Sequence, residues 1–559
     1  MQVARPFVII GVMTLAATQA RAQTASLPLK HAPGRTQTAI TPADLMTRLY
    51  VYSDDSMMGR MAGTEYNLKA TAYIAAEVKR MGLQPAGDSG GYFQNVPLVT
   101  RQLDPNARVS VDSAAALRQW DDFVPRDPGR ATRPFDGAQV VYAGTIGDSA
   151  ALTTEQAAGK FVVVRAPSFQ QINRGAILSR YRSAAGIAVT GLESFPPQAI
   201  TFFRQPATIL KDDTPRPDTS SLPVYMYVSA AATRVLLGAS LDSIRPGAAG
   251  KTVRGSIAFA ETPAPARNVV AILPGSDSRL RGQYVAIGAH NDHIGFDRTP
   301  VDHDSLRAFN DAVRKLELAA PGPNHQVARE QVQQISVNVD SLRRLHAARR
   351  DSIFNGADDD GSGTTAVLEI AEAFAGAKVK PKRSLIFVWH TGEELGLFGS
   401  QYFTDHPTVT RDSIVAQLNM DMVGRGRADD ENGGGPGYLQ LIGTRRLSTE
   451  LGDLIETVNK ARAQPFTFDY QFDASGHPEQ YYCRSDHYMY ARYGIPIAFF
   501  TTGNHRDYHQ VTDEPEYIDY DKLAHVAQFV HDVAASVANL DHRVVVDKPK
   551  PDPHGQCVQ

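Results

Sequence analysis

"RSLIFVWHTGEELGLFGS", residues 383–400, joins an apolar run to a pair of adjacent carboxylates. Residues 384–389 are almost all apolar, which is typical of a strand that is covered on both faces. Glu393 and Glu394 follow where that strand is expected to end, before a short Gly-rich turn. Adjacent carboxylates repel each other, and burying either one is costly without a partner. Therefore either both side chains lie in solvent, or a positive group lies close to them.

The length and composition of the chain limit its class. Its 559 residues predict two or three domains, and its apolar and charged fractions are those of a soluble globular protein. A net charge of -3 without a long basic run gives no electrostatic case for binding nucleic acid or anionic lipid. The two cysteines, Cys483 and Cys557, are too few for a disulfide-built fold or a thiolate-rich metal site, and the sequence leaves their pairing open.

The first 22 residues have the pattern of a secretory signal peptide. Arg5 precedes the apolar run "PFVIIGVMTLAA", and the small-residue motif "ARA" ends at Ala22, where we expect cleavage. The run is too short to span a bilayer, and no second apolar stretch of spanning length follows. We therefore expect a periplasmic or secreted protein without a membrane anchor.

The pattern of the remaining chain predicts one main domain with insertions. Residues 23–134 begin with two predicted helices and form the N-terminal part of this domain. Residues 135–258 contain short strands and turns, which indicate an inserted β-rich module. Residues 259–545 continue the main domain, interrupted at 298–352 by a charged, helix-prone insertion. The polar tail, residues 546–559, is expected to be disordered.

Strand and helix patterns alternate in the main domain. The apolar runs "RNVVAILPG", "QYVAIGAH", "SLIFVWH" and "GIPIAFFTTG" are strand candidates, and "SGTTAVLEIAEAFAGA" lies between two of them. In that segment Val367, Ile370 and Phe374 have the spacing of one buried helix face. This alternation predicts an α/β fold with a mostly parallel central sheet flanked by helices.

Histidines and carboxylates follow the predicted strands of this domain. In open α/β sheets the ligand crevice lies beyond the carboxyl ends of the strands, so five segments send such side chains to one edge. Imidazoles and carboxylates without thiolates suit zinc or a similar divalent ion, and the surplus of carboxylates suits two ions that share one carboxylate. The residues concerned are His290, Asp292, His293, Asp358, Asp359, Asp360, Glu393, Glu394, Asp421, Asp507 and His509.

Each of these motifs alone also has an ordinary structural interpretation. "GADDDGSG" fits a solvated turn with a helix cap, and "GEELG" fits an exposed helix. Their joint placement at successive strand ends favours a metal site. Consecutive residues cannot converge as a nucleophile triad, so "RSDH" (484–487) is expected to line the pocket instead. "PGSDSRLRG" (274–282) lacks the Lys and Gly spacing of a phosphate loop and is interpreted as a turn.

Taken together, these motifs resemble the co-catalytic zinc aminopeptidases of metallopeptidase family twenty-eight. That family also includes glutamate carboxypeptidase and the transferrin receptor ectodomain. The inserted module, residues 135–258, looks like the protease-associated domain that many members carry. The resemblance implies a peptide substrate and two Zn²⁺ ions per chain, although cobalt or manganese would fit the same ligands. The matching stretches are "AIGAHNDHIG", "NGADDDGSGTTAVLEIA", "GEELGLFGS", "LNMDMVG", "RSDHYMYARYGIPIAFFTTGNHRDYHQVTDEPE" and "SDDSMMGRMAGTEYNLKATAYIAAEVKRMGLQPAGD".

The resemblance implies a role for each matching position that would bind metal. Asp359 matches the bridging carboxylate between the two ions. His290 and Asp421 match the terminal ligands of the two different metals, or their equivalents, and Glu394 and His509 match the remaining ligands.

The resemblance also implies three catalytic or orienting groups. Glu393 matches the general base, which deprotonates the attacking water and returns the proton to the leaving amine. Asp292 matches the carboxylate that orients His290, and Tyr508 matches a hydroxyl donor to the scissile carbonyl. The insertion at 298–352 either covers the cleft and restricts substrates or packs on the outer surface.

Three functions follow from this resemblance. The first is a secreted metalloaminopeptidase, which "LNMDMVG" favours because that branch holds a free amine with acidic groups near the metals. The second is a carboxypeptidase or dipeptidase of the glutamate carboxypeptidase type. The third is a non-catalytic binding ectodomain, which is disfavoured because a retired site should have lost ligands or the base. The sequence determines neither the side-chain preference nor the oligomeric state.

Overall fold

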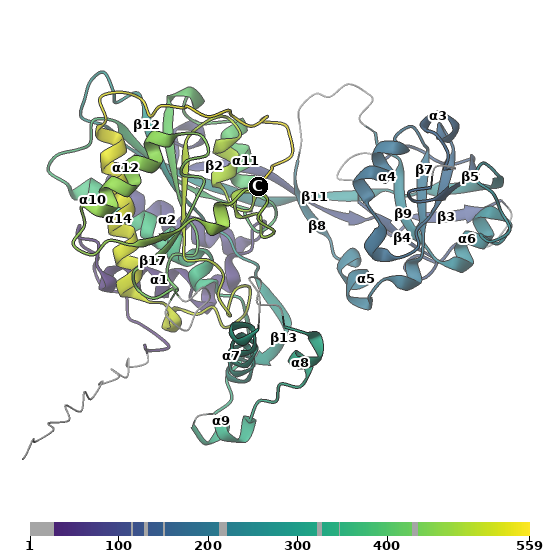
Figure 1. Cartoon of the computed structure of the whole chain (residues 1–559), viewed down its shortest axis with the longest axis horizontal. Helices are drawn as coiled ribbons and strands as arrows, with labels where there is room; N and C mark the ends of the chain where they lie inside the picture. The colour runs from purple at the N-terminus through teal and green to yellow at the C-terminus, as the bar shows by residue number, and fades with distance from the viewer. Residues whose placement is uncertain are drawn as a thin grey trace, which may run out of the picture.

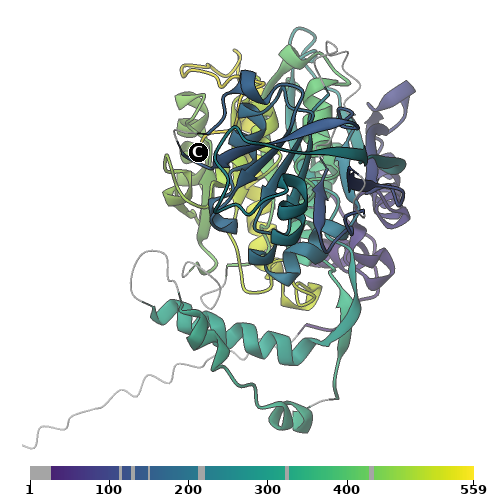
Figure 2. The same ribbon diagram turned by 90° about the vertical axis from the view of Figure 1, so that its right-hand side faces the viewer.

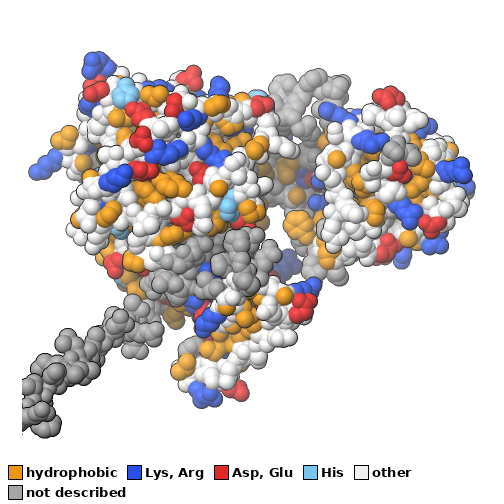
Figure 3. All heavy atoms as spheres, in the orientation of Figure 1, with side chains coloured by type: hydrophobic (Ala, Val, Ile, Leu, Met, Phe, Trp, Pro, Cys, Tyr) orange, Lys and Arg blue, Asp and Glu red, His pale blue; other side chains and the backbone are white. Residues whose placement is uncertain are grey.

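The computed structural model has a larger lobe and a smaller lobe, joined by two long strands, β2 (Phe93–Leu103) and β11 (Phe259–Leu273) (Figure 1). Acidic and basic side chains are interspersed on the face seen in Figure 3. No helix in the described part of the chain is long and apolar enough to cross a membrane. The predicted signal peptide, residues 1–22, lies outside the described residues. The structure describes residues 27–112, 116–127, 132–148, 151–211, 221–320, 327–345, 347–426 and 434–559.

The larger lobe is built on a ten-stranded sheet whose central strands are parallel. Strand β12 (Tyr284–His290) lies between β15 (Ser384–His390) and β16 (Ile414–Met420), and β16 pairs with β19 (Ile497–Thr501), all in parallel. The predicted α/β fold with a mostly parallel central sheet is confirmed, and antiparallel pairs extend it on both sides. The outer strands are β1 (Gln84–Pro85), β2, β8 (Ala207–Leu210), β11, β17 (Tyr438–Ile442) and β18 (Thr467–Asp469).

Strand β15 shows why the apolar run at 384–389 has no polar face. Leu385, Phe387 and Trp389 belong to the core on one face of the sheet, and Ile386 and Val388 belong to the core on the other. All five side chains are buried, so the strand is covered on both sides as predicted. The first face is covered by α1 (Pro42–Tyr52), α2 (Glu65–Arg80), α10 (Gly363–Gly376), α12 (Thr449–Lys460) and α14 (Tyr520–Asn539), and the second by α11 (Phe398–Asp405) and α13 (His487–Ala491).

The described part of the smaller lobe contains a separate seven-stranded sheet and four α-helices. The expected boundary of the inserted module at residue 135 is too late, because β3 and β4 already pair with strands of this sheet. The module is also not wholly separate, since β8 pairs with β2 in the larger sheet. Its elements are β3 (Arg108–Val111), β4 (Phe123–Arg126), β5 (Ala138–Thr145), α3 (Thr154–Ala157), β6 (Phe161–Arg165), α4 (Arg174–Arg180), β7 (Gly186–Thr190), α5 (Pro197–Arg204), β9 (Val224–Val228), α6 (Ala230–Leu237) and β10 (Ala249–Ser256).

The insertion at 298–352 projects from the larger lobe on a pair of antiparallel strands (Figure 2). Its described part contains three helices, the longest of which lies beneath the body of the lobe in Figure 2. Its elements are β13 (Phe296–Asp302), α7 (His303–Ala319), α8 (Arg329–Gln333), α9 (Val339–Leu345) and β14 (Arg350–Ile353).

The C-terminal tail is attached to the larger lobe, and the expectation that residues 546–559 are disordered is wrong. Cys557 forms a disulfide with Cys483. The side chain of Gln559 is buried, accepts a hydrogen bond from the main-chain N–H of Tyr482 and donates one to the carbonyl of Phe472. A covalent link and a buried terminal side chain therefore fix a segment whose composition is that of a flexible tail.

Candidate metal centre

The first cluster of candidate ligands lies where β12 and β16 end side by side. His290 is the last residue of β12, and Asp421 directly follows β16, which is its parallel neighbour. The Nε2 atom of His290 lies 3.6 Å from Oδ1 of Asp421 and 3.1 Å from Oδ1 of Asp359. Asp359 comes from the short helical turn η6 (Ala357–Ser362), which precedes α10. These three residues form one group with the spacing of metal ligands.

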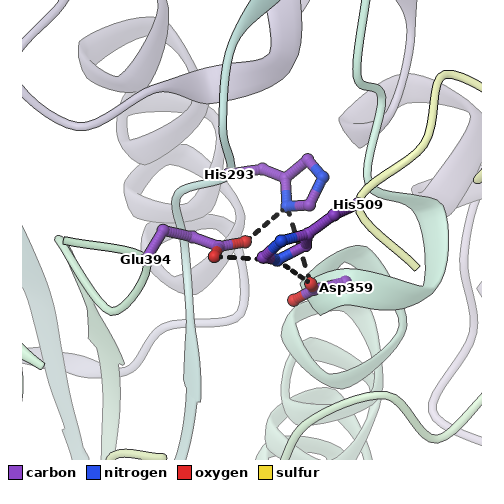
Figure 4. Close-up of side chains that lie close together, drawn as sticks. All are labelled: His293, Asp359, Glu394 and His509. Carbon is purple, nitrogen blue, oxygen red and sulfur yellow. Dashed lines mark ion pairs between the residues drawn. The ribbon is translucent and has the colours of Figure 1, made fainter. Parts of the chain in front are cut away.

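The second cluster shares Asp359 and adds His293, Glu394 and His509 (Figure 4). The Nε2 atom of His509 lies 3.1 Å from Oδ2 of Asp359 and 3.0 Å from Oε2 of Glu394. The Nδ1 atom of His293 lies 2.7 Å from Oε1 of Glu394. Asp359 thus directs one oxygen to each cluster, which is the arrangement of a carboxylate that bridges two ions.

The structure brings together all five residues that the sequence suggests as metal ligands, with one change in their grouping. His290 and Asp421 share one cluster, whereas the resemblance implies that they bind two different metals or are equivalent to such ligands. Their strands are parallel neighbours in the sheet, which places the two side chains next to each other. His293 is a sixth member, which the sequence placed at the sheet edge without a ligand role. Its signal was its position directly after Asp292 in "HNDH", but the path of the following loop was not predictable.

The chemistry of the two clusters fits divalent cations. Burying polar atoms without partners is costly, so such atoms indicate a missing positive group. The donors are imidazole nitrogens and carboxylate oxygens, which suit zinc or a similar ion. Five ligand atoms are buried without a hydrogen bond to any described residue: Nε2 of His290, Nδ1 of His293, Oε1 of Glu394, Oδ1 of Asp421 and Nε2 of His509.

The pKa values of His290 and His509 show that the two clusters contain more negative than positive charge. Burial lowers the pKa of His290, but the carboxylates of Asp421, Asp292 and Asp359 outweigh it and hold that pKa well above the usual value. Burial also lowers the pKa of His509, yet its contacts with Asp359 and the neighbouring glutamate raise it to about 10. A site that attracts protons this strongly also attracts metal cations, which compete for the same atoms.

The two aspartates beside Asp359 have structural roles. Oδ1 of Asp358 accepts a hydrogen bond from the main-chain N–H of Gly424 at 2.6 Å. Oδ2 of Asp360 accepts one from the main-chain N–H of His290 at 3.0 Å. Their carboxylates thereby fix the turn against the strand ends and leave Asp359 as the one member of the triplet that takes part in both clusters.

Glu393 and Asp292 lie next to the first cluster. The main-chain N–H of Glu393 donates to Oδ1 of Asp292 at 3.1 Å. The Nδ1 atom of His290 lies 3.1 Å from the main-chain oxygen of Asp292 and 3.7 Å from its carboxylate, so this residue contacts the ring mainly through its backbone. Burial raises the pKa of Glu393 well above its usual value; the negative charges of Asp421 and of the adjacent glutamate add to this, and His290 opposes it.

A pocket opens beside the first cluster. Three carboxylates line it, those of Asp359, Glu393 and Asp421. Arg484 and Tyr508 line it as well, and the guanidinium donates a hydrogen bond to the tyrosine hydroxyl at 3.3 Å. The pocket therefore combines a wall of three carboxyl groups next to the clusters with the guanidinium of Arg484.

The "RSDH" motif contributes to this pocket and its support. Ser485 lines the pocket and donates a hydrogen bond to Oδ2 of Asp421 at 2.8 Å. Asp486 lies 3.3 Å from Nδ1 of His390. The ring of His487 stacks on Phe499, with 4.5 Å between the centroids. Each residue of the motif thus has a separate environment, as expected for consecutive residues that do not form a nucleophile triad.

The loop that carries Tyr508 and His509 is held by the insertion. Asp507 is fully buried, and its Oδ2 accepts hydrogen bonds from Arg307 of α7 and from Arg425, both at 2.8 Å. Burial raises the pKa of Asp507, but Arg425 and Arg307 lower it to about 2. No described residue of the insertion lines the pocket. The described part of the insertion therefore braces this loop from outside.

His487 gives the protein an acid-sensitive buried group. The imidazole of His487 is fully buried, and this burial lowers its pKa from 6.5 to about 3. Between these pH values the unfolded chain binds more protons, so this group makes the folded state less stable as the pH falls.

We expect the substitution His487→Phe to remove this acid sensitivity. Between pH 7.5 and pH 5, the free energy of unfolding of the unsubstituted chain should fall by about 2 kcal/mol relative to that of the variant. Urea unfolding of both chains at the two pH values measures this difference. An unchanged difference between the two chains would show that the imidazole is not held neutral.

Comparison with known proteins agrees with the geometry of the site. Residues 268–534 match Peptidase family M28. The chain is 44% identical over 77 residues to leupeptin-inactivating enzyme 1 of Streptomyces exfoliatus, which covers 13% of this chain and 18% of that protein. It is 31% identical over 230 residues to leucine aminopeptidase 1 of Paracoccidioides brasiliensis (strain Pb18), which covers 39% of this chain and 54% of that protein.

The chain thus spans between about a fifth and about half of the length of these relatives. Among solved structures, the aminopeptidase from Aneurinibacillus sp. strain AM-1 aligns with a TM-score of 0.47 at 16% identity, over 91% of this chain and 97% of that chain. The matched segment 268–534 contains both clusters and the lining carboxylates of the pocket. Residues 268–534 of this chain are therefore similar to peptidase family M28.

Proposed function

We propose that the protein is an exported, zinc-dependent exopeptidase that removes N-terminal residues from peptides. The observation that carries this proposal is the pocket in which the carboxylates of Asp359, Glu393 and Asp421 lie together beside the two ligand clusters. A free α-ammonium group is attracted to such a wall, whereas a substrate carboxylate is repelled by it. The names of similar proteins, such as leucine aminopeptidase 1 of Paracoccidioides brasiliensis (strain Pb18), support this choice.

Two zinc ions, when bound, would supply Lewis-acid activation of the attacking water and of the scissile carbonyl. His290 and Asp421 would hold one ion, and Glu394 and His509 would hold the other. Asp359 would contribute to both positions. These side chains also orient each other, because each carboxylate of the two clusters lies close to at least one imidazole.

The chain's own groups perform the proton transfers. Glu393 would accept a proton from the attacking water and deliver it to the leaving amine, for which a raised pKa is suitable. The carboxylate of Asp292 positions Glu393 by accepting a hydrogen bond from the main-chain N–H of Glu393. Tyr508 lines the same pocket, and its hydroxyl would donate to the oxygen that becomes negative as the peptide bond breaks.

A second candidate function rests on Arg484. Its guanidinium lines the pocket together with the carboxylates, and such a group can bind a substrate carboxylate in a charge-assisted pair. This would suit a carboxypeptidase or a dipeptidase. A non-catalytic binding role is disfavoured, because the proposed base and all five proposed ligands lie together.

The compartment and the smaller lobe are part of the same proposal. The Cys483–Cys557 disulfide supports export, because such bonds persist in oxidising compartments. We assign the smaller lobe as a protease-associated domain, on the basis of its position within the peptidase domain and its β-rich core.

We expect the purified protein to cleave peptides that have a free N-terminus and to spare their N-acetylated copies. Amidation of the C-terminus should leave cleavage unchanged, and dialysis against a chelator should abolish it until zinc is restored. Chromatographic analysis of matched peptide sets measures both effects. Loss of cleavage on amidation, with acetylated peptides still cleaved, would instead support the carboxypeptidase.

Glu393→Gln should lower the rate of cleavage by about 10²- to 10⁴-fold, because the proton acceptor is lost. The zinc content of this variant should be unchanged, since the residue is a proposed base and not a ligand. Glu394→Gln is the matched control and should lose zinc. Loss of zinc from Glu393→Gln would contradict the assignment of the adjacent glutamates.

Arg307→Ala should lower kcat/KM by about tenfold, a cost typical of small misplacements of catalytic groups. The change removes one of the two guanidinium partners of Asp507, which directly precedes Tyr508. Arg298→Ala, an exposed position on the same insertion, is the control and should retain full activity. Equal activity of the two variants would show that the insertion does not position this loop.

A further inference from the structure

We propose that the two metal positions are unequal, because His293 is a fourth protein ligand of the ion held by Asp359, Glu394 and His509. This inference rests on the proposed metal centre and goes beyond the five ligands that the family resemblance implies. The His293 ring is fully buried. Its Nδ1 atom lies 2.7 Å from Oε1 of Glu394 and 3.8 Å from Oδ2 of Asp359.

The Nε2 atom of His293 makes no hydrogen bond to any described residue, and the contact of its Nδ1 atom with Glu394 does not have the geometry of a hydrogen bond. A buried imidazole that only supported the fold would be expected to satisfy at least one nitrogen with a neighbouring donor or acceptor. A metal ion accepts an electron pair from such a nitrogen and removes the cost of burying it. In Figure 4 the Nδ1 atom faces the carboxylates of Asp359 and Glu394, as a ligand nitrogen should.

The absence of a side chain at Gly356 leaves space for the His293 ring. Gly356 has a φ of +51°, and a Cβ atom there would lie 2.6 Å from the Cγ and Cδ2 atoms of His293. The same Cβ atom would lie 2.2 Å from the main-chain oxygen of Asp359. On the other side the ring meets His509 edge to face, with 5.6 Å between the centroids and 71° between the planes. The glycine therefore allows the imidazole and the bridging aspartate to approach each other.

The numbers of protein ligands at the two positions then differ. The first position has three protein ligands, namely His290, Asp359 and Asp421. The second position has four, namely His293, Asp359, Glu394 and His509. Zinc sites with four protein ligands are closed, and sites with three keep one position open for water or substrate. The second ion should therefore be held more tightly, and the first should exchange more readily.

The pocket opens on the same side as the position with three ligands. Its lining includes Asp421 and Asp359, which belong to the first cluster, and Glu393, the proposed base. His293, Glu394 and His509 are not among its lining residues. The substrate would thus meet the ion with the open position, and the ion beside His293 would mainly keep Asp359 and Glu394 in place.

The test counts zinc per chain during removal by a chelator. The zinc-loaded protein is dialysed against increasing dipicolinate, and bound zinc is measured by mass spectrometry of the digested sample. The unsubstituted chain should lose one zinc first and retain the second to a higher chelator concentration. In His293→Ala the second zinc should leave at a chelator concentration at least about tenfold lower, since even groups that only orient a ligand contribute about 10- to 100-fold to metal affinity.

His290→Ala is the matched control, because it removes one imidazole from the other cluster. It should lose the weakly held zinc and retain the tightly held one. X-ray absorption spectra of the unsubstituted chain with one zinc bound provide a measurement without any substitution. They should show two imidazole ligands, whereas one imidazole would mean that His293 only orients Glu394 and would overturn the inference.

The remaining outcomes separate this inference from the proposed function. Release of both zinc ions at the same chelator concentration would overturn the inequality and leave the peptidase proposal intact. A chain that binds no zinc at all would overturn both. Circular dichroism of each variant establishes that a change in zinc content does not come from unfolding.

Discussion

The sharing of one buried carboxylate between two clusters is the constraint on which the rest of the site depends. Asp359 lies 3.1 Å from His290 through one oxygen and 3.1 Å from His509 through the other. Burial raises the pKa of Asp359, but the two imidazoles hold it well below the usual value. A carboxylate in this position is stable only if cationic or metal partners lie on both sides of it. The fold must therefore deliver ligands from opposite directions to one point.

The parallel sheet delivers one side of this arrangement. Because β12 and β16 are parallel neighbours, His290 and Asp421 leave the same sheet edge next to each other. The turn before α10 lies across that edge. The hydrogen bond from the main-chain N–H of His290 to Asp360 fixes the position of this turn relative to the end of β12. His290, Asp421 and Asp359 are thus positioned by two strand ends and one turn, which is typical of α/β enzymes.

The other side of the arrangement depends on loops that the sheet does not control. His509 lies in the loop after β19, and the buried Asp507 holds this loop between Arg425 and Arg307. One of these two arginines comes from the insertion, about 200 residues earlier in the chain. Braced in this way, the loop can keep its imidazole close to Asp359 without help from regular secondary structure.

Much of this centre could be predicted from the sequence, because its ligands follow strands with strong apolar patterns. The run at 384–389 predicted a strand covered on both faces, and the residues after it predicted a carboxylate pair at the site. The grouping of His290 with Asp421 could not be predicted, because it depends on the order of strands in the sheet. His293 could not be selected either, because its ring position depends on the approach of Gly356.

The sequence also did not predict where the smaller lobe begins or that the C-terminal tail is ordered, and both failures have the same physical reason. Strands β3 and β4 are short, and only their pairing with β10 and β9 assigns them to the second sheet. The tail is polar and rich in proline, which predicts disorder, but one disulfide to Cys483 attaches it. Contacts between distant parts of the chain decided each of these features, and a local pattern does not contain them.

The most direct test of the metal centre is anomalous diffraction at the zinc absorption edge from crystals grown with zinc. The account predicts two peaks, one on each side of Asp359. The first should lie against His290 and Asp421, and the second against Glu394 and His509. A map without a peak at Asp359, from a protein shown to be folded and supplied with zinc, would contradict the account.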